Sequence, residues 1–150
     1  MIHHKRTRRR GATLVETTLV TSAFMMLLLG MLDLGLGVMR HNTLSHAARQ
    51  GARQAVVHGS LSSSPWGSSA YGPVTADTNA AIPNAIRPHL TGMPPAEVNV
   101  SATWPDGGNA QEHQHRVQVT VNYAYTPMLT YIFGNFSVTL SATSTMYIAH

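Results

Sequence analysis

Two acidic side chains, Glu16 and Asp33, interrupt a stretch that is otherwise uncharged from Ala12 to Met39. A carboxylate at the centre of a membrane costs about 2.5–3.5 kcal/mol on insertion scales, so an acid in such a stretch usually has a partner. At 1.5 Å per residue the two acids lie about 26 Å apart along a helix. The chemistry they offer is charge pairing in a layer of low dielectric constant, where removing one partner leaves the other stranded.

Each acid also has a plainer interpretation. Glu16 could reach the cytoplasmic interface and pair with Arg10, and Asp33 could lie at the outer interface in water. In the functional interpretation, Asp33 shares a helical face with Gly30 and Gly37, and small residues on such a face let another helix approach closely. The sequence leaves these alternatives open for both acids.

No group of side chains in the rest of the sequence indicates catalysis or metal binding. Zinc needs three or four convergent ligands, whereas His113 and His115 share a strand face without a third histidine at ligand spacing. The chain has no cysteine, which excludes disulfides and thiolate metal sites. We therefore expect no cofactor, no metal and no enzymatic activity.

The net charge of +4 belongs to one short tail. The first ten residues hold five basic side chains, which leaves the rest of the chain with five arginines against six acids. Because this tail adjoins an apolar run, its charge indicates orientation, since positive segments stay in the cytoplasm. We interpret residues 1–11 as a basic cytoplasmic leader and expect no nucleic-acid partner.

The apolar run is long enough to cross a membrane. A transmembrane helix needs about 20 mostly apolar residues, and residues 12–39 meet this length without the polar stripe of a soluble helix. A secretory signal cut after Ala47 is the alternative. Small residues recur every three to four positions beyond Arg40, which predicts that the helix continues over residues 40–58 outside the membrane. There Arg49 and Arg53 share one face, either as a helix contact or as a solvated flank.

The remaining residues, 59–150, predict an extracytoplasmic α+β domain. Residues 59–74 are rich in serine, glycine and proline and are expected to form a loop, and a second helix is expected to begin near Thr75 or Asp77. Apolar and polar residues alternate over 98–104, 117–125 and 136–142. This alternation predicts about three antiparallel strands with one face on the long helix.

The N-terminal sequence resembles a known family. Three arginines, Gly11-Ala12 and then Glu16 at the start of an apolar helix resemble the processing pattern of prepilins. With Leu-Gly-Met-Leu-Asp-Leu-Gly at 29–35 and Ala-Ala-Arg-Gln-Gly-Ala-Arg at 47–53, and similarities within 117–146, the chain resembles the TadE-like family, the minor pilins or pseudopilins of the Tad (Flp) pilus machinery. Family members often have an aromatic residue after the glutamate, where this chain has Thr17.

The resemblance implies a role in pilus assembly. A prepilin peptidase would cut between Gly11 and Ala12, and Glu16 would pair with the freed amine of a neighbouring subunit, since such an amine is cationic near neutral pH. The implied fold is pilin-like, with the C-terminal half of the helix packed on the sheet. The implied partners are other pilin or pseudopilin subunits and the assembly platform, in the bacterial inner membrane with the N-terminus in the cytoplasm.

A function from another class stays open. The chain could be a membrane-anchored extracytoplasmic binding module that takes no part in pili. Trp66, Tyr71 and Trp104 would then be its candidate contact residues, although packing in the core explains Trp104 better.

Overall fold

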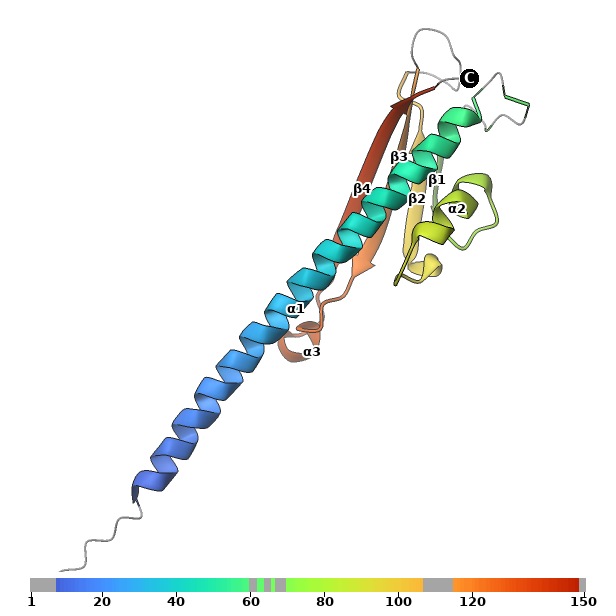
Figure 1. Cartoon of the computed structure of the whole chain (residues 1–150). Coiled ribbons are helices and arrows are strands. Elements are labelled where there is room, and N and C mark those ends of the chain that lie inside the picture. Colours follow the sequence, from blue (N-terminus) through green and yellow to red (C-terminus); the bar gives the residue numbers. More distant parts are fainter. Residues whose placement is uncertain (1–7, 60–61, 64–65, 67–69, 107–114, 149–150) are drawn as a thin grey trace, which may run out of the picture.

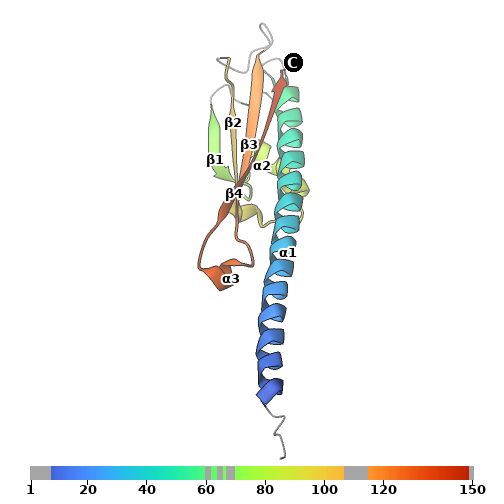
Figure 2. The same cartoon turned by 90° about the vertical axis from the view of Figure 1, so that its left-hand side faces the viewer.

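A helix of 50 residues, α1 (Arg8–Val57), forms the axis of the molecule, and a sheet packs along its C-terminal half (Figure 1). The computed structural model describes residues 8–59, 62–63, 66, 70–106 and 115–148. The N-terminal half of α1 extends beyond the sheet as an isolated rod (Figures 1 and 2). The predicted plan of a long apolar helix on a small antiparallel sheet is thus confirmed.

The sheet has four strands in the order β1-β2-β3-β4, and every neighbouring pair is antiparallel. The strands are β1 (Tyr71–Thr75), β2 (Val98–Thr103), β3 (Arg116–Tyr125) and β4 (Val138–Tyr147). The prediction of three strands was therefore one short, because β1 lies where a loop was expected. Its pairing is interrupted between Tyr71 and Val74, where Gly72 has a φ of 87° and Pro73 cannot donate to the ladder. An edge strand tolerates both residues.

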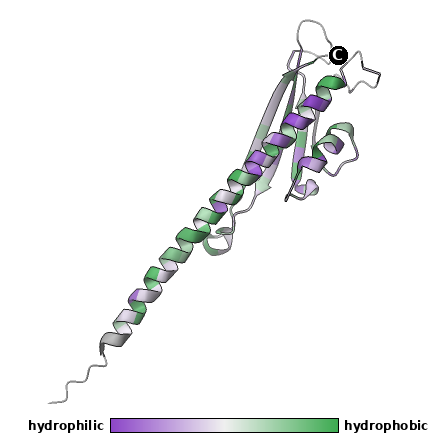
Figure 3. Cartoon of the chain, in the orientation of Figure 1, coloured by the Kyte–Doolittle hydropathy of each residue, from purple (hydrophilic) through white to green (hydrophobic). Residues whose placement is uncertain are grey.

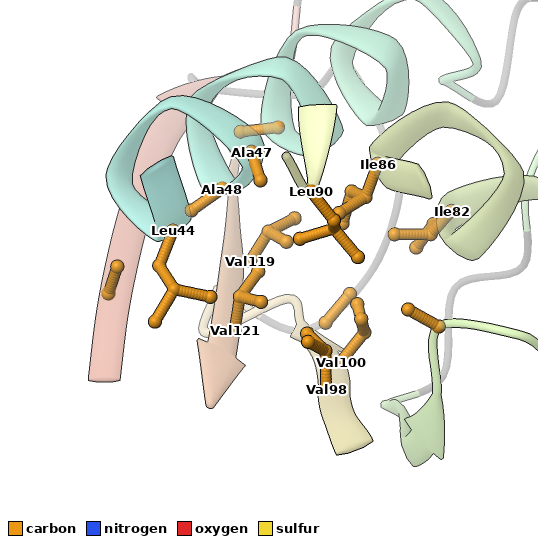
Figure 4. Close-up of a cluster of buried hydrophobic side chains, with 14 of the residues drawn as sticks. Leu44, Ala47, Ala48, Ile82, Ile86, Leu90, Val98, Val100, Val119 and Val121 are labelled. Atoms are coloured by element: carbon orange, nitrogen blue, oxygen red, sulfur yellow. The ribbon is translucent and has the colours of Figure 1, made fainter. Parts of the chain in front are cut away.

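The two faces of the sheet differ in polarity as the alternation predicts. Along β3 the valines at 117, 119 and 121 are fully buried, while Gln118, Thr120 and Asn122 lie on the opposite face. Helices α1 and α2 (Ala81–Ile86) cover the apolar face (Figure 4). On the polar face the hydroxyls of Thr120 and Thr143 lie 3.1 Å apart across β3 and β4. One half-buried sheet with its helices on one side is the result.

Small side chains on α1 allow the helix to lie close to the sheet. The buried positions of its C-terminal half are Leu44, Ala47, Ala48, Gly51, Ala52 and Ala55. A Cβ atom at Gly51 would come within 2.8 Å of Ile86 Cδ1 in α2 and 3.3 Å of Val119 Cγ1 in β3. Gly51 therefore marks the point where the three elements meet most tightly.

The expected start of the second helix was wrong. Thr75 is the last residue of β1, and its hydroxyl donates to the Asp77 carboxylate within a turn. The Arg87 guanidinium donates to the backbone carbonyls of Ala76, Asp77 and Thr78 at 3.1, 2.7 and 3.2 Å. These contacts hold residues 75–78 as a turn, so α2 starts only at Ala81, with no side-chain cap on its N-cap residue Ala80.

The two short 3-10 helices follow α2. They are η1 (Arg87–His89) and η2 (Pro95–Glu97), and each has a proline in its first turn. Proline lacks an N–H, which the first turn does not use. Pro88 therefore ends α2, whereas Pro83 is accommodated near its start, in a buried position.

An ion pair joins the end of β2 to the start of β3. The Arg116 guanidinium donates to both oxygens of Asp106, at 2.8 and 3.0 Å, and the Arg116 backbone N–H donates to Oδ2 at 2.9 Å. These hydrogen bonds from Arg116 lower the pKa of the Asp106 carboxyl to about 2. The contact holds the end of β2 beside the start of β3.

We expect Gly51→Leu to lower the free energy of unfolding of the domain by about 1–3 kcal/mol, because the new side chain overpacks the junction with Ile86 and Val119. Thermal unfolding in a mild detergent measures the change. Gly35→Leu is the matched control, since no atom lies within 4 Å of its Cβ position, and both variants gain the same helix propensity. Equal midpoints for the two variants would contradict the packing shown here.

The Asp106 carboxyl is expected to titrate near pH 2, well below the usual value of about 3.9, in a carbon-13 NMR titration. Because its folded pKa is depressed, the ion pair stabilises the fold above about pH 4 and loses this effect as the pH falls through about 2. Arg116→Gln should return the midpoint towards 4. A parent midpoint already near 4 would mean that the pair does not form in solution.

Candidate functional site

The predicted processing and pairing residues lie on the isolated part of α1. Every residue from Gly11 to Leu28 is exposed, Ala12 and Glu16 among them. Within the described part of the chain, the Glu16 side chain makes no hydrogen bond or ion pair. Its predicted alternative partner, the Arg10 side chain, lies outside the described residues. The Glu16 carboxylate thus projects from the exposed surface of an apolar helix, where a partner from another chain could reach it.

Three polar side chains near Glu16 are satisfied within the helix. The Thr17, Thr18 and Ser22 hydroxyls donate to backbone carbonyls three or four residues earlier, at 2.8, 2.8 and 2.9 Å. A polar group in lipid must find such an internal partner, because no water is present. Figure 3 shows this half of α1 as mostly hydrophobic, and α1 is long and apolar enough to cross a membrane.

Asp33 has a very different environment from Glu16. Its side chain is only 5% exposed and receives three hydrogen bonds from the last residue of β3 and the segment that follows it. The Met128 and Leu129 backbone N–H groups donate to Oδ1 and Oδ2, both at 2.8 Å, and the Tyr125 hydroxyl donates to Oδ1 at 3.2 Å. The interpretation of Asp33 as an acid in water is therefore wrong. Within this chain the carboxylate holds the β3–β4 connection against α1.

Gly30 and Gly37 flank Asp33 and let the connection reach it. A Cβ atom at Gly30 would lie 3.8 Å from Leu129 Cδ1, and one at Gly37 would lie 3.7 Å from the Tyr125 ring. The face that the sequence assigned to a helix contact is thus occupied by the chain's own connection between β3 and β4. We call Gly30, Asp33, Gly37, Tyr125 and Leu129 the Asp33 clamp.

Arg40 completes the charged face of the helix one turn beyond Gly37. Its guanidinium lies over the rings of Tyr123 and Tyr125, at 5.5 and 4.7 Å from their centroids, and donates to the Tyr123 hydroxyl at 3.1 Å. Burial, and then the neighbouring Asp33 carboxylate, raise the pKa of the Tyr125 phenol above its usual value. Tyr125 therefore stays a hydrogen-bond donor at neutral pH and connects the acid to the arginine.

An apolar groove runs beside the clamp, between α1 and the start of β4. It has a volume of about 410 Å³, and the residues lining it include Leu34, Val38, Phe136, Val138 and Leu140. Phe136 was expected to begin the last strand, but β4 starts at Val138. The connection itself contains a single-turn helix, α3 (Thr130–Phe133), which the sequence did not reveal.

Arg49 and Arg53 lie on α1 well away from the clamp. Both side chains are exposed, as a solvated flank or a free contact surface would be. Among the described residues, no group of three or more potential ligands is placed to hold a metal ion. The structure thus brings Gly30, Asp33 and Gly37 together and leaves Glu16, Arg49 and Arg53 separate along the helix.

Residues 11–53 match the family model of the TadE-like proteins. The chain carries a TadE-like segment. No curated protein and no solved structure matches the chain. The TadE-like segment begins at Gly11, near the start of the bare half of α1, and ends at Arg53 within the half that packs on the sheet. It therefore contains Glu16, Asp33 and Arg40, whereas the similarity suggested for residues 117–146 lies outside the match.

The sequence showed the acid of the clamp but not its donors. Two of the three donors are backbone N–H groups, which have no signature in side-chain type. The available signal was Tyr125-Thr-Pro127 at the end of an alternating strand, together with Arg40 seven residues after Asp33 on the same helical face. These residues are the sequence features that could indicate a partner for Asp33.

Asp33→Ala should release the β3–β4 connection, because it leaves two backbone N–H groups without an acceptor. Amide exchange at Met128 and Leu129 is expected to accelerate between roughly five- and 150-fold, which corresponds to ~1–3 kcal/mol. Tyr125→Phe removes one donor and spares both amides, so its effect should be smaller. The Ala76 amide, bonded to Val98 at 2.8 Å, is the internal control. Unchanged exchange at Met128 and Leu129 would contradict the clamp.

Proposed function

We propose that this chain is a minor pilin or pseudopilin of a Tad (Flp) pilus, with a structural rather than an enzymatic role. A prepilin peptidase cuts between Gly11 and Ala12. The bare half of α1 stays in the inner membrane with its N-terminus at the cytoplasmic side, and the sheet lies outside. The observation that carries the proposal is the TadE-like match over residues 11–53, whose first residue is the glycine of the proposed cleavage site.

The geometry of α1 supports assembly through Glu16. After cleavage, the Ala12 amine would begin a helix whose N-terminal N–H groups already attract negative charge. Glu16 lies four residues further on, exposed and without a partner among the described residues. In a low-dielectric layer, the amine of one subunit and the Glu16 carboxylate of another stabilise each other, and each is costly alone. Pairing would therefore set the register between neighbouring subunits.

The fold favours a retained helix over a secretory signal cut after Ala47. Ala47 and Ala48 are both fully buried in the middle of the helix–sheet contact. Cleavage there would remove Leu44, one of the largest fully buried side chains, and would separate Arg40 from its tyrosines. The domain would lose part of its own core.

The same fold weighs against the binding module. Trp104 is 8% exposed and belongs to the core, as its packing interpretation predicts. The Trp66 ring stacks on His58 with centroids 4.4 Å apart, and Tyr71 is half-buried at the edge strand. These aromatic residues support the fold and do not form one exposed contact surface.

The mature protein is expected to have the mass of residues 12–150, measured on chain extracted from piliated cells. Glu16→Gln should be cut normally but recovered in sheared pili in much smaller amount, because the amine of the neighbour loses its counter-charge. Thr17→Gln is the control, since it places the same side chain at the next exposed position, and Glu16→Asp keeps the charge.

Three outcomes would overturn the proposal. A mass that starts at Met1 or Ala48 would exclude processing after Gly11. Normal recovery of Glu16→Gln in pili would exclude the pairing role. Unchanged piliation in cells that lack the protein would exclude a function in assembly and favour the binding module.

A further inference from the structure

Among the residues that the structure describes outside α1, the β3–β4 connection, residues 126–137, gathers the most exposed large hydrophobic side chains. Five of its side chains are large, hydrophobic and open to the surroundings. They are Met128, Tyr131, Ile132, Phe133 and Phe136, with exposed fractions of 53%, 93%, 58%, 58% and 43%. From Val117 to His150 the sequence contains no lysine, arginine, aspartate or glutamate. A soluble surface rarely gathers so many apolar side chains without a partner.

The position of the connection along α1 indicates what this partner is. The Asp33 clamp fixes it beside Gly30 and Asp33, and both views show α3 beyond the end of the sheet, next to the apolar half of the helix (Figures 1 and 2). Measured from Glu16, Gly30 and Asp33 lie about 21 and 26 Å along the helix. Both values fall within the hydrocarbon thickness of about 30 Å.

This result does not depend on where the span begins. A span of about 20 residues that starts anywhere between Ala12 and Val20 ends between Met31 and Met39. In every placement the level of Gly30 lies inside the hydrocarbon layer, and Asp33 lies inside it or near its outer boundary. The exposed side chains of the connection are therefore continuous with the exposed apolar surface of α1, as parts of one lipid-facing surface.

The neighbouring segment at the same end of the sheet has the opposite character. Residues 76–97 carry the exposed charges Asp77, Arg87 and Glu97, and Figure 1 shows α2 further from the N-terminal end of α1 than α3. The charged residues lie at the level of the sheet, and the apolar connection lies nearer the N-terminal end of α1. This order matches the change from lipid headgroups to hydrocarbon. Tyrosine is also a residue enriched at this boundary.

We propose that the β3–β4 connection enters the outer leaflet of the bilayer beside α1, so that two elements hold the chain in the membrane. The occupant of its apolar surface is lipid. The Asp33 clamp makes the insertion possible, because the carboxylate and the two N–H groups that it binds satisfy one another at a depth where water is scarce. The inference rests on α1 spanning the membrane, as in the proposed function, and does not depend on pili.

The chain offers a direct test because it has no cysteine. Single cysteines are introduced by Tyr131→Cys and, as a second site, Ile132→Cys, and the full chain is labelled with a nitroxide and placed in phosphatidylcholine–phosphatidylglycerol vesicles. Electron paramagnetic resonance then compares collision with oxygen, which concentrates in lipid, and with a water-soluble nickel chelate. Leu27→Cys on the bare part of α1 is the lipid reference, and Thr145→Cys on the polar face of β4 is the water reference.

The expected result is an oxygen-to-nickel accessibility ratio at residues 131 and 132 close to that at Leu27 and well above that at Thr145. A ratio like that of Thr145, with Leu27 still in lipid, overturns the insertion and leaves the span intact. A water-like ratio at Leu27 overturns the span and the insertion together. Low collision with both reagents and spin–spin broadening at 131 and 132 would mean that a second copy covers the surface, which also overturns the proposal.

Discussion

The hydrogen bonds between the Asp33 carboxylate and the start of the β3–β4 connection determine how the sheet joins the bare apolar half of α1. Without an acceptor on α1, the Met128 and Leu129 N–H groups would be half-buried donors with no strand or helix to receive them. Without the donors, the Asp33 carboxylate would lie unpaired on an apolar stretch of the helix. The carboxylate and the two N–H groups satisfy each other, so removing either one leaves the other without a hydrogen-bond partner.

Two sets of small residues make this arrangement possible, and they act at different heights on α1. Gly30 and Gly37 admit Leu129 and the Tyr125 ring beside the acid, while Gly51 and its alanine neighbours admit Ile86 and Val119 in the core. The first set lets the hydrogen-bond donors of Asp33 come close to α1, and the second lets the helices pack closely on the apolar face of the sheet. Arg40 lies between them, where the tyrosine rings cover its guanidinium.

Much of this plan could be predicted from the sequence, because it depends on local periodicity. The long apolar helix, its small-residue stripe and the alternation along β2 and β3 each follow from residue types at fixed spacing. The strand β1 escaped prediction because Gly72 and Pro73 have the composition of a loop, and only the partner strand β2 gives the segment its hydrogen bonds. Similarly, α3 has one turn and no capping side chain.

In the candidate site, too, the features set by local geometry could be predicted, and those set by long-range contacts could not. The sequence placed Glu16 on a bare helix and put Asp33 on one face with Gly30 and Gly37, since all of this is helical geometry. It could not assign Asp33 its partners, because they come from residues more than 90 positions away and two of them are backbone groups. Long-range pairing of that kind depends on the tertiary fold and leaves no local pattern.

The continuity of α1 also has a mechanical consequence. The helix has no proline along its 50 residues, so it forms a continuous rod of about 75 Å with no break between its bare apolar half and the domain. Turning the bare half about its axis turns the sheet through the same angle, and tilting one end swings the other. Any contact that fixes the rotation of the N-terminal end therefore fixes which way the polar face of the sheet points.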